Sequence, residues 1–309
     1  MSKVVSMGEC LIDFIPSSET EYKANPGGAP ANVCACVSKL GGEGYYLGRV
    51  STDSFGSFLM DEMKKSGIRL DYVTRDDIHK TTLAFVTLKN GERSFSFYRD
   101  DTADLNFDAQ DVNSNMFSKG DILHFCSLGL ASSTSRKAHA KAIMLAEKNG
   151  GIVSFDVNMR ENLWPSRKEM LDAIVGFMPY ADIIKMSQEE LAILSPEEDI
   201  KSIFAIADKA SLIFITKGEE GSTVYSRDLN NYSVVAHKCD VVDTTGAGDA
   251  YIGAILYKLS KGEAELSVEN MKDAMQFASV VSSLVCSSKG ALASMPTLQK
   301  VKEILWKII

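Results

Sequence analysis

Residues 122–156 read ILHFCSLGLASSTSRKAHAKAIMLAEKNGGIVSFD and contain the pattern that decides the fold. Two short apolar runs, Ile122–Cys126 and Ile152–Asp156, flank a segment, 134–149, whose apolar residues recur at three- and four-residue spacing. Uninterrupted apolar runs of this length are typical of strands buried on both faces, and the spacing between them indicates a helix that covers the sheet. The stretch therefore predicts a βαβ unit with parallel strands.

The same alternation continues along the 309-residue chain, which is long enough for one large core with a small appendage. Further apolar runs predict strands, and further segments with helical spacing predict helices. The runs are 4–7, 183–186 and 212–216, and the helical segments are 29–40, 54–66 and 268–287. We therefore expect an α/β fold: a doubly wound, mostly parallel sheet covered by helices.

Two regions interrupt this rhythm. Residues 81–89 and 92–99 alternate polar and apolar side chains on either side of Asn90-Gly91, a dipeptide that supplies the positive φ angles of a type I′ hairpin turn. Residues 10–24 also look extended. These stretches predict a small additional β-sheet near the N-terminal half.

We expect this small sheet to be a lid over the ligand edge of the large sheet. It would be built from about 10–25 and 79–102. The chain shows no internal repeat, low-complexity tract or Pro/Ser linker. The lid is therefore expected to belong to a single domain, 1–309.

Composition and charge exclude several classes of function. With 45% hydrophobic and 24% charged residues the chain has the composition of a globular protein. Its net charge of −8 argues against non-specific binding to nucleic acid or anionic membranes, because both need clustered positive charge. We expect no signal or transit peptide, and no apolar run approaches the ~20 residues that span a bilayer. The six cysteines form no C-x-x-C pair, which indicates reduced thiols and a cytoplasmic location.

The most informative motif is residues 243–249, DTTGAGD, between a strand-like segment, 238–242, and a helical run, 250–259. Gly246, Ala247 and Gly248 at such a junction expose backbone N–H groups at the positive end of a helix, where anionic oxygens bind. Asp249 follows directly and is placed to accept a hydroxyl proton while those groups stabilise a transferring phosphoryl. A glycine turn with a helix-starting aspartate and no catalysis remains the alternative interpretation.

Other phosphate-binding motifs are absent from the sequence. There is no G-x-x-x-x-G-K-[ST] and no H-R-D or D-F-G set, which excludes P-loop enzymes and protein kinases. The dinucleotide fingerprint G-x-G-x-x-G also fails, because Asp-Ala-Tyr follows the second glycine. An NAD-dependent dehydrogenase is therefore disfavoured.

The motif 243–249 resembles the signature of the ribokinase-like (PfkB) carbohydrate kinases, and residues 27–32, GGAPAN, resemble the sugar-site signature of that family. The resemblance covers the whole chain. Within the family, GECLIDFIP, GERSFSFYR followed by TADL, and FDVNMRENLW are most similar to bacterial fructokinases. This implies an enzyme that transfers a phosphoryl group from ATP to the primary hydroxyl of a furanose sugar, with fructose 6-phosphate as the expected product.

The resemblance also implies roles for individual residues. Asp249 would be the catalytic base, with the N–H groups of residues 246–248 holding the phosphoryl and Arg160 as its charge partner. The residues expected to bind sugar are Asp13, Gly28, Asn32, Arg99 and Asn158. Asn158 and Arg160 also follow a buried strand, where open α/β sheets place their ligands.

For the nucleotide and metals, the resemblance implies Ser187, Thr216, Gly218 and Gly248 at the ATP site. Serine at 187 departs from the asparagine common in the family, which weakens its assignment. Glu190 would hold Mg²⁺ through water, and Mg²⁺ is expected because it bridges and neutralises nucleotide phosphates. Potassium-dependent relatives imply a K⁺ site, for which the candidates are Asp243, Thr245, Val285, Gly290 and Ser294.

Several alternatives stay open on the sequence. A kinase acting on aminoimidazole riboside has very similar signatures, while ribokinases and 2-keto-3-deoxygluconate kinases are less similar. A sugar-binding regulator without catalysis is the second class, although the intact Asp249, Gly246 and Gly248 argue against it. The expected partners are a sugar and ATP. A homodimer through the lid is also expected, since partner chains often cover exposed sheet edges.

Overall fold

The computed structural model describes residues 2–18, 20–89 and 92–306. The strands of the larger sheet are β1 (Val4–Met7), β4 (Gly44–Ser51), β5 (Arg69–Asp76), β8 (Ile122–Cys126), β9 (Ile152–Asp156), β10 (Ile183–Ser187), β11 (Leu212–Thr216), β12 (Ser222–Ser226) and β13 (Asn231–Val234). The smaller sheet contains β2 (Leu11–Pro16), β3 (Tyr22–Gly27), β6 (Thr82–Lys89) and β7 (Glu92–Tyr98). The α-helices are α1 (Ala29–Lys39), α2 (Ser54–Lys65), α3 (Ser133–Lys148), α4 (Arg167–Phe177), α5 (Gln188–Leu194), α6 (Ile200–Ile206), α7 (Ala247–Ser260), α8 (Lys272–Cys286) and α9 (Leu298–Leu305).

The larger sheet has the order β13-β12-β11-β10-β9-β8-β1-β4-β5, and the smaller sheet has the order β3-β2-β6-β7. Neighbouring strands from β11 to β5 run parallel, and β12 and β13 are antiparallel additions at one edge. The predicted fold class, a mostly parallel helix-covered sheet with a small second sheet, is confirmed.

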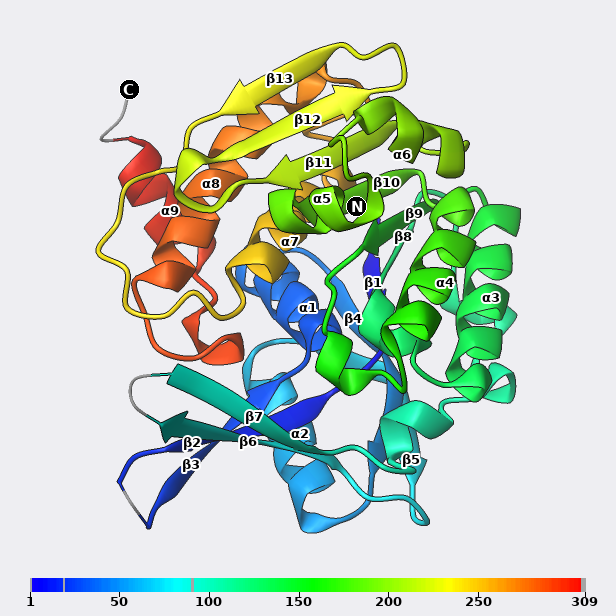
Figure 1. Cartoon of the computed structure of the whole chain (residues 1–309), viewed down its shortest axis with the longest axis vertical. Helices are drawn as coiled ribbons and strands as arrows, with labels where there is room; N and C mark the ends of the chain where they lie inside the picture. Colours follow the sequence, from blue (N-terminus) through cyan, green and yellow to red (C-terminus); the bar gives the residue numbers. More distant parts are fainter. Residues whose placement is uncertain (1, 19, 90–91, 307–309) are drawn as a thin grey trace.

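Helices cover both faces of the larger sheet (Figure 1). The buried apolar residues divide into two clusters, one with side chains of α1, α7 and α8 and the other with side chains of α3 and α4. Val4 of β1 packs into the first cluster and its neighbour Val5 into the second, and both are fully buried. Successive residues of a strand point to opposite faces, so a two-sided core requires the uninterrupted apolar runs seen in the sequence.

The chain passes from the large sheet into the small sheet at the carboxyl end of β1. β1 ends at Met7, and the chain enters β2 at Leu11 before returning through β3 to α1. β1 lies between β8 and β4, so successive strands are added on both sides of it. In open α/β sheets such a change of direction, at the carboxyl ends of the strands, is where ligands bind. The small sheet, β3-β2-β6-β7, therefore follows directly from the carboxyl end of β1 (Figure 1).

The strand expected at 238–242 is wrong. These residues are irregular, with Val241 66% and Val242 50% exposed. The backbone N–H groups of Val242 and Asp243 donate to the carbonyl of Cys286, at 2.8 and 3.1 Å, so the end of α8 binds them instead of a neighbouring strand. A segment rich in β-branched residues forms a strand only where a neighbouring strand can pair with it by hydrogen bonds.

Two helix boundaries also differ from expectation. The helix after the glycines begins at Ala247 rather than 250, so Gly248 and Asp249 belong to its first turn. The segment 268–287 begins with a 3-10 turn before α8 starts at Lys272. The expected Asn90-Gly91 turn lies outside the described residues. Within those residues, no helix is both long and apolar enough to cross a membrane.

Candidate active site

The start of α7 combines a tight glycine turn with a carboxylate. Gly246 precedes the helix with φ 81°, a left-handed conformation that glycine adopts without strain. A Cβ at this position would also lie 2.9 Å from the Cβ of Ala291. The first N–H groups of a helix have no partner within the helix, and Asp249 lies in this first turn. The N–H of Ala247 donates to the carbonyl of Thr244 at 3.2 Å. The geometry is that of an anion site with a base beside it.

A hydrogen bond joins Asp249 to Asn32 of the GGAPAN motif, residues 27–32, more than 200 residues away in the sequence. The amide Nδ2 of Asn32 donates to Oδ2 of Asp249 at 2.8 Å. Asn32 lies on α1, which begins after Gly28, where φ is 110° and a Cβ would lie 2.5 Å from the carbonyl of Glu9. Oδ1 of Asn32 is buried with no hydrogen-bond partner among the described residues, so it can accept from a ligand hydroxyl.

Opposing effects set the protonation of Asp249. Burial raises the pKa of its carboxyl, while the hydrogen bond from Asn32 and the positive charges of Lys185 and Arg160 lower it. Arg160 is exposed, and its Nη1 donates to the carbonyl of Met159 at 2.7 Å. Burial is the largest effect, so the pKa of Asp249 is raised overall. A carboxylate with a raised pKa is a stronger base, which suits it to accept a proton.

Lys185 is a site residue that the sequence reasoning missed. It stands opposite Asp156 in the β9–β10 register and donates to both carboxylate oxygens at 3.0 and 3.1 Å, with 7% of the lysine exposed. A Cβ at Gly248 would lie 2.9 Å from its ammonium, so this glycine leaves room for the charge. Burial raises the pKa of Asp156 to about 7, against the opposing charge of Lys185. The sequence signal for this residue is a lysine inside the apolar run IIKMS. A lysine is rarely buried unless its ammonium is paired with an acidic group.

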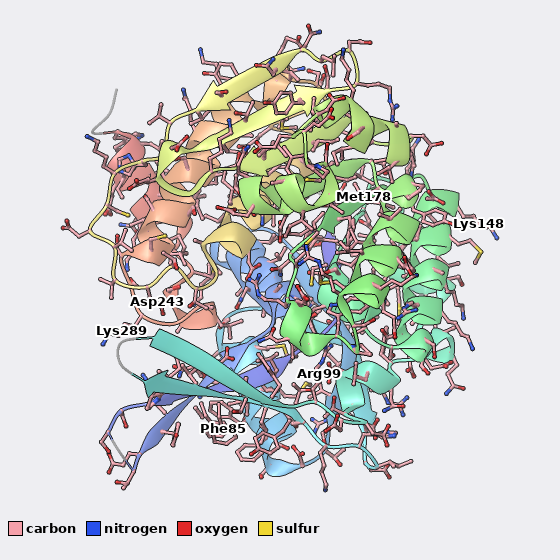
Figure 2. The ribbon with its side chains drawn as sticks, in the orientation of Figure 1. Phe85, Arg99, Lys148, Met178, Asp243 and Lys289 are labelled. Carbon is pink, nitrogen blue, oxygen red and sulfur yellow. The ribbon has the colours of Figure 1, made fainter. Side chains whose placement is uncertain are left out.

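The other residues expected to bind sugar lie on different elements. Asp13 of β2 is partly buried, and burial raises its pKa to about 6. Asn158 follows β9 with φ 36°, and its carbonyl accepts a hydrogen bond from the hydroxyl of Ser127 at 3.1 Å. Asparagine tolerates this left-handed conformation better than most residues, and such conformations cluster at functional sites. Arg99 lies where the lid strands meet the core (Figure 2).

The expected nucleotide residues lie at the ends of two neighbouring strands. Ser187 of β10 is paired with Thr216 of β11, and Gly218 follows with φ 56°. The Ser187 hydroxyl accepts from the backbone N–H of Glu190 at 3.2 Å, and Oε2 of Glu190 accepts from the Ser187 N–H at 2.8 Å. This capping box fixes the start of α5.

Glu190 has a second structural partner, because its Oε1 accepts the backbone N–H of Met159 at 2.7 Å. Each carboxylate oxygen can accept one further hydrogen bond, so Glu190 fits a metal-bound water. Among the residues that the structure describes, no three acidic, histidine or cysteine side chains form a metal-binding cluster. A Mg²⁺ ion here would therefore take most of its ligands from nucleotide phosphates and water.

Three of the five candidate K⁺ residues are linked by hydrogen bonds. Oδ1 of Asp243 accepts from the N–H and hydroxyl of Thr245, at 3.0 and 2.7 Å, and Oδ2 accepts from the N–H of Gly290 at 3.2 Å. Val285 lies in the last turn of α8 and Ser294 in the 3-10 turn Leu292–Ser294. Figure 2 shows Asp243 on the same side of the molecule as Lys289. The structure thus links Asp243 to Thr245 and Gly290 directly.

A buried carboxylate, a helix N-terminus and a buried ammonium at the edge of a doubly wound sheet are the features expected of a small-molecule kinase. A family model confirms the class more narrowly: that of the pfkB family carbohydrate kinases matches residues 1–298. The chain belongs to this family.

Comparisons with individual proteins point in the same direction. The chain is 36% identical to a probable fructokinase-5 of Arabidopsis thaliana, with 98% of this chain and 97% of that protein covered. A fructokinase with bound ATP from Xylella fastidiosa has a TM-score of 0.93 at 31% identity, with 99% and 98% of the two chains covered.

Two further solved structures are informative about ligands. A fructokinase double mutant from Vibrio cholerae O395, in a form with fructose, ADP and potassium ion bound, has a TM-score of 0.90 at 33% identity, covering 99% of this chain and 98% of that chain. An aminoimidazole riboside kinase from Salmonella enterica, complexed with aminoimidazole riboside and an ATP analog, has a TM-score of 0.88 at 27% identity, covering 98% and 99%.

Proposed function

We propose that this protein is an ATP-dependent fructokinase, which transfers the γ-phosphoryl group of ATP to the primary hydroxyl of D-fructose and releases fructose 6-phosphate and ADP. The observation that carries the proposal is the 2.8 Å hydrogen bond from Asn32 to Asp249. It joins the GGAPAN motif, residues 27–32, to the proposed base at the start of α7. Similarity to fructokinases over nearly the whole chain supports fructose as the sugar.

In the proposed reaction Asp249 accepts the proton of the sugar hydroxyl while the oxygen attacks the γ-phosphorus. The N–H groups at the start of α7 and the Lys185 ammonium stabilise the negative charge on the phosphoryl oxygens as the bond to ADP breaks. Asn32 holds Asp249 through Nδ2 and leaves Oδ1 for the sugar. Asp13, Gly28, Asn158 and Arg99 complete the proposed sugar site, and Arg160 is the proposed charge partner of the phosphoryl group.

For the nucleotide we propose a site at the ends of β10 and β11, formed by Ser187, Thr216, Gly218 and Gly248. Bound Mg²⁺ would supply neutralisation of the nucleotide's phosphate charge. Glu190 is the residue that we assign to hold it through water. The capping box positions that carboxylate, because the N–H groups of Ser187 and Met159 fix both of its oxygens.

We also propose that K⁺ binds near Asp243 and activates the enzyme by holding the turn 243–249. The similarity to a fructokinase solved with potassium ion supports this, as does the direct link from Asp243 to Gly290. Replacing choline chloride by an equal concentration of KCl, at saturating Mg²⁺-ATP in sodium-free buffer, should raise the rate. Asp243→Ala should remove the response, and equal rates of the wild type in both salts would contradict the K⁺ site alone.

The function is tested by measuring ADP release with a panel of acceptors: fructose, ribose, 2-keto-3-deoxygluconate and aminoimidazole riboside. We expect kcat/KM to be highest for fructose. The riboside is the second candidate, because an aminoimidazole riboside kinase shares the fold at 27% identity. A higher kcat/KM for the riboside would replace the proposed substrate, and no sugar-dependent ADP release from any acceptor would favour a binding protein.

A further inference from the structure

Arg99 is held rigidly at the junction of lid and core. It follows β7 and is only 8% exposed. Its Nε donates to Oδ2 of Asp104 at 2.9 Å, and its Nη2 lies 2.8 Å from the same oxygen and donates to the carbonyl of Leu128 at 3.0 Å. Nη1, by contrast, is buried with no hydrogen-bond partner among the described residues. A buried guanidinium nitrogen without an acceptor is costly, so a ligand is the natural source of one.

Asp104 fixes the direction in which Nη1 of the Arg99 guanidinium points. Its Oδ1 accepts hydrogen bonds from the hydroxyls of Thr82 and Thr102, at 2.5 and 2.7 Å, while Oδ2 is used by Arg99. Asp104 is 7% exposed and lies in the 3-10 turn Ala103–Asn106. Both of its oxygens are therefore committed to the protein, and nothing in its surroundings suits it to touch substrate itself.

The network spans the joint between the two sheets. Thr82 begins β6 of the lid, Arg99 follows β7, and Leu128 lies in the 3-10 turn Ser127–Leu130 that follows β8 of the large sheet. Glu9 is a second buried carboxylate that interacts electrostatically with Arg99. It accepts a hydrogen bond, at 3.1 Å, from the N–H of Ala29 in the GGAPAN motif, residues 27–32. Arg99 thus stands between the lid, the core and the turn expected to hold the sugar.

We propose that Asp104 is a positioning residue for sugar binding: it orients Arg99 so that Nη1 donates a hydrogen bond to an oxygen of the sugar. This rests on the proposed function, and it adds a residue that acts only through another. Because guanidinium geometry is planar and fixed, the hydrogen bond from Nε to Asp104 and the one from Nη2 to Leu128 determine where Nη1 points. Loss of Asp104 should therefore impair recognition of the sugar and leave that of ATP intact.

The test compares Asp104→Asn with Asp101→Asn, using initial rates with each substrate varied in turn. Asp104→Asn should raise the KM for fructose at least about tenfold and change the KM for ATP less than about twofold. Asp101, in the same loop, has an 82% exposed side chain. Its Oδ1 accepts from Nδ2 of Asn106 at 2.8 Å and lies 3.6 Å from Nε2 of His79, and neither of these contacts involves Arg99. Asp101→Asn should leave both constants unchanged.

A double-mutant cycle separates positioning from general damage. In an Arg99→Ala background, Asp104→Asn should raise the KM for fructose little further, because its partner is gone. If Asp104→Asn does not fold, Arg99→Lys should show the same separation of the two KM values, since an ammonium cannot satisfy three acceptors in a plane.

An unchanged KM for fructose in a folded Asp104→Asn enzyme, or full additivity in the cycle, would overturn the inference. So would an Arg99→Lys enzyme with wild-type values. A wild type that does not phosphorylate fructose would instead contradict the proposed function. The same comparison of KM values then applies to whichever sugar is phosphorylated.

Discussion

At the scale of single residues, Asp249 separates chemistry from binding. Its carboxylate is proposed to accept the proton, whereas the proposed anion site beside it consists of backbone N–H groups at the start of α7, which do not depend on the side chain. Asp249→Asn should therefore lower kcat by about 10²–10⁴-fold, the usual cost of losing a general base, while nucleotide binding measured by calorimetry changes little. A variant that retains more than about a tenth of the wild-type kcat would show that another group accepts the proton.

Lys185 makes a second residue-scale prediction, on the pH dependence of kcat. Its positive charge lowers the pKa of Asp249, so Lys185→Met should raise that pKa. A base works only when deprotonated, so the acid limb of the profile should move to higher pH, together with a fall in kcat of about tenfold or more. Lys168→Met, which removes an 84% exposed ammonium, is the matched control and should leave the limb in place. An unmoved limb in Lys185→Met would mean that Lys185 has only a structural role.

The sequence could predict the site residues that belong to contiguous signatures, such as Gly28 with Asn32 and Gly246 with Asp249. It could not predict the partners that complete them. Lys185 and Asp156 acquire their roles from a contact between two strands, 29 residues apart in the sequence, which no local pattern encodes. Asp104 lies only five residues from Arg99, but its contact with Thr82 of β6 depends on how the chain folds back. Their residue type was the available clue, since charged groups inside buried segments need partners to offset desolvation.

At the scale of elements, five buried strands of the larger sheet were predictable, whereas β4 inside that sheet and the strands at its edges were not. The runs at β1, β8, β9, β10 and β11 are apolar because both of their faces are covered. β5, by contrast, reads RLDYVTRD and lies at the edge of the larger sheet, where charged side chains face solvent and erase the apolar signal. The opposite error at 238–242 arose because a β-branched composition does not supply a neighbouring strand.

The lid yields an element-scale prediction about assembly, which we propose to be a homodimer. One face of the described lid sheet carries an aromatic cluster, Phe14, Tyr22, Phe85 and Tyr98, with ring centroids 4.7–5.6 Å apart. Phe55 of α2 packs on Phe14, but Tyr98 stays 62% and Tyr22 42% exposed. A second copy of the chain would cover these rings, because a closed two-fold contact pairs the same surface on both subunits.

Tyr98→Glu should therefore shift the protein toward monomer, because it places a charge in the covered face. Sedimentation velocity at several concentrations measures the shift. Ile78→Glu, which changes a 74% exposed apolar residue outside the lid strands, should leave the assembly unchanged. A wild type that is monomeric at all concentrations would contradict the dimer while leaving the catalytic proposals untouched.

At the scale of the whole molecule, the burial of Glu9 beside the proposed site should make the free energy of unfolding depend on pH. Folding buries Glu9 almost completely, at 1% exposure, and burial raises its pKa from 4.5 to about 7 although Arg99 opposes the rise. Between these values the folded protein holds a proton that the unfolded chain releases. The contribution of Glu9 to the free energy of unfolding is therefore fully present below about pH 4.5 and is lost as the pH rises through about 7.

Glu9→Gln should remove this pH dependence, because the amide stays neutral and can still accept the N–H of Ala29. Relative to the wild type, the variant should gain up to about 3 kcal/mol of unfolding free energy between pH 5 and pH 8, which is the equivalent of the pKa rise. Denaturant titrations of the ligand-free proteins at several pH values measure the difference, and Glu43→Gln reports what loss of an exposed carboxylate does in the same series. A constant difference between Glu9→Gln and the wild type across this range would mean that Glu9 stays ionised in the folded protein. The charge of Arg99 would then be satisfied from both sides by carboxylates, leaving less of it for a sugar.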